Sequence, residues 1–277
     1  MVSVSFYGVR GSTPCSCPST QRYGGNTACV VLEHADEDPI VFDLGTGLRM
    51  YGVAYDGESF NGSALVTHLH WDHVQGLPFF APVNMPGATF DVYGPTHEGQ
   101  SMKKAFGKFM RPPYFPIQVE HLVGDIQFHD VNDETIKIGS AEVMVRSVPH
   151  VGATNGYRVD WGGASVTYIS DHQEPVGKPN KVAKSVLELC EGVDLLIHDA
   201  QYTPSEFEQK ANWGHCTIRY AIEVAQQAGV KTLALFHHDP AHSDDELDEL
   251  HAEAAGVAKD LGALEVICAS EGMVVEL

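Results

Sequence analysis

Long apolar runs and basic side chains are both scarce in this sequence. No apolar stretch reaches the roughly 18–20 residues that a transmembrane helix needs. Residues 1–8 carry neither the basic segment nor the long apolar segment of a signal peptide. The sequence therefore predicts a protein without a membrane span and with a cytoplasmic location, where its six cysteines are expected to stay reduced.

The shortage of basic residues has a second consequence. Lysine and arginine number 17 against 37 acidic residues, so the formal net charge is −20 over 277 residues. An excess of negative charge repels polyanions at long range. Long nucleic acid is therefore not expected as a partner, whereas a small substrate held by local contacts remains compatible with the charge.

Short apolar segments, separated by glycine, proline and polar turns, predict strands that alternate with helices along the chain. Helices are predicted over residues 181–190, 217–228 and 243–261, the last opening with the capping box Ser243-x-x-Glu246. Strands are predicted over 2–6, 28–33, 40–43, 64–67, 135–138, 141–148, 157–160, 165–169, 194–197, 232–236, 264–268 and 273–276. This interleaving favours one layered α/β domain over residues 1–277.

One irregular stretch, residues 95–118, departs from that pattern. It combines basic and aromatic side chains: Lys103, Lys104, Lys108, Arg111, Phe106, Phe109, Tyr114 and Phe115. In so acidic a chain we interpret the stretch as a substrate-facing lid. An ordinary surface loop is the alternative.

The strongest motif is a cluster of metal-binding side chains within His68-Leu69-His70-Trp71-Asp72-His73. Residues i and i+2 of an extended segment point to the same side, so His68 and His70 can bind one cation together. Asp72 and His73 follow in the next turn and can reach a neighbouring cation. Imidazole and carboxylate ligands suit zinc and other divalent first-row metals.

This HxHxDH string after a short strand resembles the signature of the metallo-β-lactamase superfamily. The resemblance extends over nearly the whole chain and implies an α/β fold, a four-layer αββα sandwich with one or two metals at one edge. The implied metal ligands are His68, His70 and His150 for one site, Asp72, His73 and His237 for the other, and Asp171 as a bridge. Asp43 matches a family residue that orients ligands, and His238 remains an alternative to His237.

Two further motifs resemble the phosphodiesterase branch of that superfamily, which includes tRNase Z. His215, in Trp213-Gly214-His215-Cys216-Thr217, matches a residue that protonates the leaving oxygen, although Cys216 departs from the Gly-His-Ser/Thr pattern. Asp199 matches the acidic residue that orients this histidine. Asp72 is grouped with these two as catalytic, and Arg10 is a candidate for binding the substrate phosphate. In the alternative interpretation, His215 only caps a helix and Asp199 only solvates a strand end.

The opening segment, residues 6–14 and 23–27, is most similar to hydrolases of small phosphodiesters. The resemblance thus implies cleavage of small phosphodiesters, cyclic nucleotides among them, by a metal-bound hydroxide that attacks phosphorus. It also implies two divalent metal ions, Zn²⁺ first and Mn²⁺ or Fe²⁺ as alternatives, and it allows a homodimer. The alternatives are a tRNA 3′-end processing endoribonuclease, whose long basic arm the sequence lacks, and a lactone or thioester hydrolase or iron oxidoreductase on the same fold.

Overall fold

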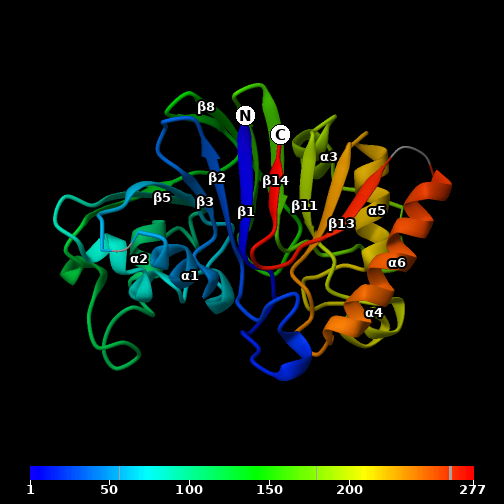
Figure 1. The fold of residues 1–277 in the computed structure, drawn as a ribbon, viewed down its shortest axis with the longest axis horizontal. Helices are drawn as coiled ribbons and strands as arrows, with labels where there is room; N and C mark the ends of the chain where they lie inside the picture. The colour runs from blue at the N-terminus through cyan, green and yellow to red at the C-terminus, as the bar shows by residue number, and fades with distance from the viewer. Residues whose placement is uncertain (56, 179, 262–263) are drawn as a thin grey trace.

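The computed structural model describes residues 1–55, 57–178, 180–261 and 264–277. Two seven-stranded sheets face each other, and helices cover the outer face of each sheet (Figure 1). The predicted four-layer αββα arrangement is confirmed. The first and last strands, β1 and β14, lie side by side, so the two termini meet at the same end of the first sheet.

Each sheet mixes parallel and antiparallel neighbours. The first sheet has the order β14-β1-β2-β3-β4-β5-β6. Its strands are β1 (Val2–Gly8), β2 (Cys29–His34), β3 (Ile40–Phe42), β4 (Asn61–Leu65), β5 (Thr89–Gly94), β6 (Asp125–Asp130) and β14 (Val274–Glu276). The second has the order β13-β12-β11-β10-β9-β8-β7. Its strands are β7 (Thr135–Ile138), β8 (Ala141–Ser147), β9 (Asn155–Trp161), β10 (Ala164–Ile169), β11 (Leu195–Asp199), β12 (Thr232–Phe236) and β13 (Glu265–Cys268).

Strand direction decides which chain segments meet at one edge. In the first sheet β3 to β6 are parallel, and β1 runs the same way because β2 is antiparallel to both β1 and β3. In the second sheet β10 to β13 are parallel, and β8 shares their direction because β9 is antiparallel to both β8 and β10. Strands of one direction end at one edge of their sheet, so the segments that follow them become neighbours.

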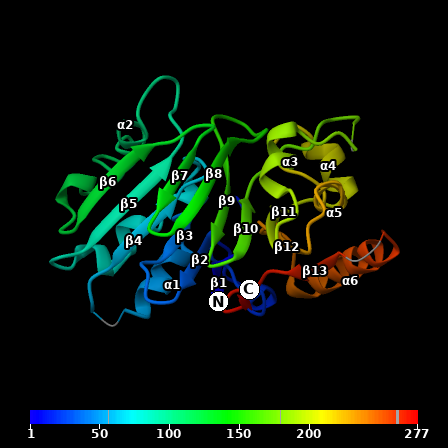
Figure 2. The ribbon, with the colours of Figure 1, turned by 90° about the horizontal axis from the view of Figure 1, so that it is seen from above.

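The helices divide between the two outer faces (Figures 1 and 2). They are α1 (Gly47–Val53), α2 (Met102–Phe106), α3 (Lys184–Cys190), α4 (Pro204–Lys210), α5 (Ile218–Gln227) and α6 (Asp244–Leu261). Within the residues that the structure describes, short 3₁₀ helices also occur at Pro18–Thr20, Trp71–His73, Leu77–Phe79, Ala81–Asn84 and Val119–His121. α1 packs on β1 and β2, whereas α3, α5 and α6 pack on the second sheet.

The predicted helices correspond to α3, α5 and α6. Of the predicted strands, β7 pairs with β8 and β9 pairs with β10, both antiparallel. Helices α1, α2 and α4 and strands β5 and β6 were not predicted. These three helices have seven residues or fewer, too few for a clear helical period. β6 alternates only exposed and half-buried residues, so its place comes from parallel pairing with β5 rather than from its own sequence.

An aromatic cluster joins the two sheets at the centre of the core. The ring of Phe42 on β3 stacks on that of Tyr168 on β10, with centroids 4.6 Å apart. Phe236 on β12 contacts both Tyr168 and Phe6 of β1. Since these residues come from both sheets, the core fixes the position of one sheet relative to the other.

Among the described residues, no helix combines the length and the apolar character that crossing a membrane requires.

We predict that Phe6→Ala lowers the free energy of unfolding by about 3–5 kcal/mol, because it removes a buried ring and leaves a cavity between the sheets. Urea unfolding followed by circular dichroism measures this loss. Val53→Ala, which truncates an exposed side chain of α1, serves as the control and is expected to change stability by less than about 0.5 kcal/mol. Equal stabilities of the two variants would contradict the assignment of the core.

Candidate metal centre

Seven polar side chains converge at the edge where strands of both sheets end. His68 and His70 lie in the segment after β4, and the 3₁₀ helix Trp71–His73 supplies two more side chains. His150, Asp171 and His237 follow β8, β10 and β12 of the second sheet. The structure thus brings together every residue that the sequence predicted as a metal ligand.

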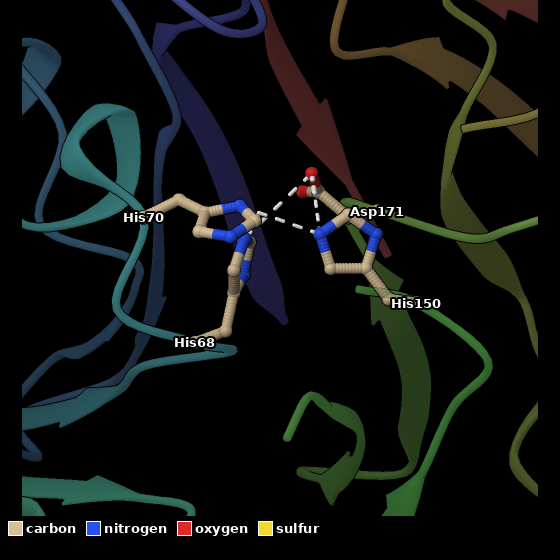
Figure 3. A group of neighbouring side chains, drawn as sticks. All are labelled: His68, His70, His150 and Asp171. Atoms are coloured by element: carbon tan, nitrogen blue, oxygen red, sulfur yellow. Dashed lines mark hydrogen bonds and ion pairs between the residues drawn. The ribbon is translucent and has the colours of Figure 1, made fainter. Parts of the chain in front are cut away.

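Four of these side chains form the first group (Figure 3). His68 and His70 approach from the first sheet, and His150 and Asp171 approach from the second. Asp171 Oδ2 lies 3.8 Å from His68 Nε2 and 3.7 Å from His150 Nε2, and His150 Nε2 lies 3.4 Å from His70 Nδ1. Each residue offers a ligand atom within 4.8 Å of the others, which is close enough to surround one cation.

Asp72, His73 and His237 form a second, buried group. Asp72 Oδ2 lies 3.1 Å from both His73 Nε2 and His237 Nε2. The other carboxylate oxygen of Asp171, Oδ1, lies 3.1 Å from His73 Nε2 and 3.5 Å from His237 Nε2. The two oxygens of Asp171 therefore face different groups, which is the arrangement that a carboxylate bridging two cations requires.

The chemistry of these atoms fits a divalent metal. His68 Nε2 and Asp171 Oδ1 are buried and have no hydrogen-bond partner among the described residues. Burying such atoms without a partner is costly. Burial also lowers the pKa of His68, His70 and His150, which keeps their rings neutral and able to coordinate. The His/Asp clusters thus suggest divalent metal binding.

Asp43, which directly follows β3, orients the second group. Its Oδ2 accepts hydrogen bonds from His73 Nδ1 at 2.7 Å and from the Tyr168 hydroxyl at 2.9 Å. Its Oδ1 accepts from the Thr67 amide at 2.8 Å. Burial would lower the pKa of His73, but the carboxylates around the ring, Asp72 first, raise it well above its ordinary value. The hydrogen bond at Nδ1 leaves Nε2 directed at Asp72 and Asp171.

Other supporting residues escaped the sequence analysis. Gln201 Oε1 lies 3.1 Å from His237 Nδ1, and Gln201 Nε2 donates to Ser12 Oγ. The Ser12 amide donates to Asp72 Oδ2 at 2.7 Å. These residues also follow strands that end at this edge, β11 for Gln201 and β1 for Ser12. Only that position could have marked them, because serine and glutamine carry no metal-binding signal of their own.

Two glycines allow the backbone to approach the cluster. A Cβ at Gly11 would collide with the His237 ring, and one at Gly214 would collide with the His150 ring. Gly214 has a φ of +98°, which also disfavours other residues, and its carbonyl oxygen accepts a 2.7 Å hydrogen bond from His150 Nδ1. Glycine is therefore needed at both positions, because no space remains for a side chain beside the two histidine rings.

His215 and Asp199 form a pair beside the two groups. His215 Nδ1 lies 3.0 Å from Asp199 Oδ2, and Asp199 is fully buried. Burial would lower the pKa of His215, but the carboxylates around it, Asp199 first and then Asp171 and Asp72, together raise that pKa. His215 borders a hollow of about 420 Å³ together with Ser12, His70, Trp71, Asp72 and Asp171. His215 thus borders this hollow, whereas its partner Asp199 lies buried away from it.

The structure corrects one expectation and resolves one alternative. Arg10 is fully buried, and its guanidinium donates to the carbonyl oxygens of Gly24, Asp239 and His242. It ties three backbone segments together and is not available to a substrate phosphate, so the predicted role of Arg10 is wrong. His238 Nε2 contacts the carbonyl of Ala269, whereas His237 faces the cluster.

The sequence and the fold of this chain are similar to those of known proteins. The sequence model of a family described as "Beta-lactamase superfamily domain" matches residues 62–238, more than half of the chain. A ribonuclease Z of Haloarcula marismortui is 26% identical, over 98% of this chain and 95% of the relative. The metallo-beta-lactamase fold protein YhfI from Bacillus subtilis superposes with a TM-score of 0.73 at 19% identity, covering 100% of this chain and 99% of the other. Human tRNase Z, short form, gives a TM-score of 0.67 at 19% identity, covering 99% and 98%.

These relatives contradict the expectation that long nucleic acid is excluded as a partner. Several chains that match this one over nearly its full length are named ribonuclease Z. The expectation rested on the net charge of −20. Net charge is a sum over the whole surface, whereas a bound strand meets only one face, where the local charge can differ from the total.

We predict that Asp171→Ala lowers the bound metal, because the variant removes the carboxylate that both groups share. Elemental analysis of protein purified with added Zn²⁺ measures the content per chain. Asp125→Ala, at the exposed start of β6, controls for the loss of one acidic residue and is expected to match the wild type. Full metal content in Asp171→Ala would refute the bridging position.

We also predict that Asp43→Asn raises the dissociation constant for metal by about 10- to 100-fold, as expected when a residue that orients a ligand is lost. The amide would present a donor where His73 and Tyr168 need an acceptor. Competition with a chromophoric chelator measures the affinity. Asp194→Asn is the matched control, since Asp194 accepts similar hydrogen bonds from Ser165. It directly precedes β11, at the end of that strand away from the candidate metal centre. An unchanged affinity in Asp43→Asn would show that the hydrogen bond does not tune the site.

Proposed function

The chain belongs to the beta-lactamase superfamily of hydrolases, and from that premise we propose that it is a metal-dependent phosphodiesterase that cleaves RNA. The observation that carries the proposal is the His215–Asp199 pair beside two groups of metal-binding side chains. The ribonuclease Z relatives support RNA as the substrate class more than they support small cyclic phosphodiesters. We take Zn²⁺ as the first candidate metal, with Mn²⁺ and Fe²⁺ as alternatives.

Cleavage of a phosphodiester requires both the groups of metal-binding side chains and the His215–Asp199 pair. When bound, divalent metal ions stabilise charge on phosphoryl oxygens and lower the pKa of water. His68, His70 and His150 would hold one ion, Asp72, His73 and His237 the other, and Asp171 both. The leaving alkoxide is a poor leaving group unless a proton reaches it in the transition state, and that proton must come from a positioned side chain.

His215 is the side chain that would donate this proton. Its Nδ1 is bonded to Asp199, so the ring presents Nε2 as the atom left to serve a substrate. Asp199 is itself held by the amides of His172 and Gln201, at 2.9 and 3.0 Å, which fixes the direction of the histidine ring. Asp199 is thus a positioning residue, and His215 is the proposed general acid.

Small phosphodiesters, cyclic nucleotides among them, are the second candidate substrate. The hollow at the site, about 420 Å³, has the size of a pocket for a small ligand. A panel on metal-loaded protein would separate the candidates: precursor tRNA, 3′,5′- and 2′,3′-cyclic nucleotides, a lactone and a thioester. Cleavage of precursor tRNA with the highest kcat/KM supports the proposal, whereas faster turnover of the carbon esters than of every phosphodiester would overturn it.

We predict that His215→Ala lowers kcat on RNA by about 10²–10⁴-fold. The loss should be much smaller on p-nitrophenyl phosphodiesters, because nitrophenolate leaves without a proton. His251→Ala, which removes a histidine of α6 outside the site, controls for the loss of an imidazole. Elemental analysis of His215→Ala should show unchanged metal content, and equal losses on both kinds of substrate would refute the acid role.

A further inference from the structure

A second hollow, of about 600 Å³, adjoins the candidate metal centre. Segment 95–118 and the turns after β4 line it mainly with aromatic rings: Trp71, Phe79, Phe109, Tyr114 and Phe115. Trp71 also lines the hollow over the metal centre, where it stands between His70 and Asp72 in the sequence. The two hollows therefore adjoin at this side chain.

These rings are unusually exposed. Trp71 is 74% exposed, Phe79 is 59% exposed and Tyr114 is 77% exposed. Scattered apolar residues on a surface need no explanation, but a cluster of them around a hollow marks a binding site. Phe79 and Phe115 meet edge to face with centroids 6.0 Å apart, so the wall of the hollow is preformed.

Charge distinguishes this face from the rest of the acidic surface. Lys108 lines the aromatic hollow, and Lys103, Lys104 and Arg111 line a neighbouring one on the same segment. None of the four forms an ion pair with the residues that the structure describes, whereas arginines elsewhere, such as Arg146 and Arg158, do. Aromatic rings flanked by free cations are the combination that binds single-stranded nucleic acid.

We propose that the aromatic hollow binds the base of the nucleotide next to the scissile phosphate. The proposal rests on the proposed function, because it takes the phosphodiester to lie at the metal centre. A base against Trp71 would then be one side chain away from His70 and Asp72. Lys108 would face the negatively charged backbone of the same nucleotide. The hollow thereby supplies binding energy that does not depend on base identity, since every base has a face that stacks.

Binding of adenosine monophosphate and of ribose 5-phosphate to metal-loaded protein tests the hollow without turnover. The two ligands share the phosphate and the sugar, and only the first has a base. Calorimetry is expected to show that Tyr114→Ala raises the Kd for adenosine monophosphate by about 5- to 150-fold, the range for one stacked base, and leaves ribose 5-phosphate unchanged. Val123→Ala, an exposed apolar residue outside the hollow, is expected to match the wild type. An unchanged Kd for adenosine monophosphate in both Tyr114→Ala and Trp71→Ala would overturn the proposal.

Kinetics provide the second arm. Thymidine 5′-(p-nitrophenyl phosphate) and methyl p-nitrophenyl phosphate share the p-nitrophenolate leaving group, and they differ in carrying a nucleoside or a methyl group. Tyr114→Ala and Trp71→Ala should raise KM only for the thymidine ester, and Trp71→Phe should restore most of the loss. Equal effects on both esters would show that the substitutions disturb the metal centre instead. Hexaadenylate that binds more tightly than adenosine monophosphate would identify an RNA strand as the source of the base, and equal affinities would identify a mononucleotide.

The outcomes separate this inference from the proposed function. If the protein cleaves no phosphodiester but Tyr114→Ala still weakens binding of adenosine monophosphate, the proposed reaction fails and the base site stands. If the protein cleaves RNA but neither Tyr114→Ala nor Trp71→Ala alters that binding or KM, the base site fails and the reaction stands.

Discussion

The carboxylate of Asp171 is the point on which the arrangement of the site depends. One of its oxygens faces His68 and His150, and the other faces His73 and His237. Histidines from two different sheets thereby share one buried acidic group. Without a cation between them, this edge would bury polar atoms at a cost that the aromatic core must offset. The stability of the site therefore depends on the packing between the two sheets.

The backbone around the cluster carries strain that the rest of the fold must hold. Asp43 and His237 both adopt positive φ, 56° and 59°, although neither is glycine. Such conformations cost about 1–3 kcal/mol and persist only where the surroundings fix them. Each residue directly follows a buried strand, β3 or β12, and each contacts a side chain of the second group. At these two positions the strained backbone sets the direction of a side chain of the site, whereas the positive φ of Ala35, Glu98 and Asp133 lies elsewhere.

Charge is distributed unevenly over this protein. Acidic residues dominate the sequence, yet four basic residues of segment 95–118 lie together beside exposed aromatic rings. The sum of charges led to the wrong expectation about long nucleic acid, because a substrate responds to the field at one face. The interpretation of segment 95–118 as a lid stays a prediction. Its side chains do line two hollows, one of which adjoins the site.

The sequence by itself determined the layered α/β class and the candidate metal-binding side chains. Histidine and aspartate carry their chemistry wherever they lie, and each followed an apolar strand that could be recognised locally. Only the tertiary structure decided how they combine: which oxygen of Asp171 faces which histidines, that Arg10 is buried among backbone carbonyls, and that Gln201 and Ser12 support the ligands. These facts depend on strands far apart in the chain ending at one edge, and no local pattern of residues records that pairing.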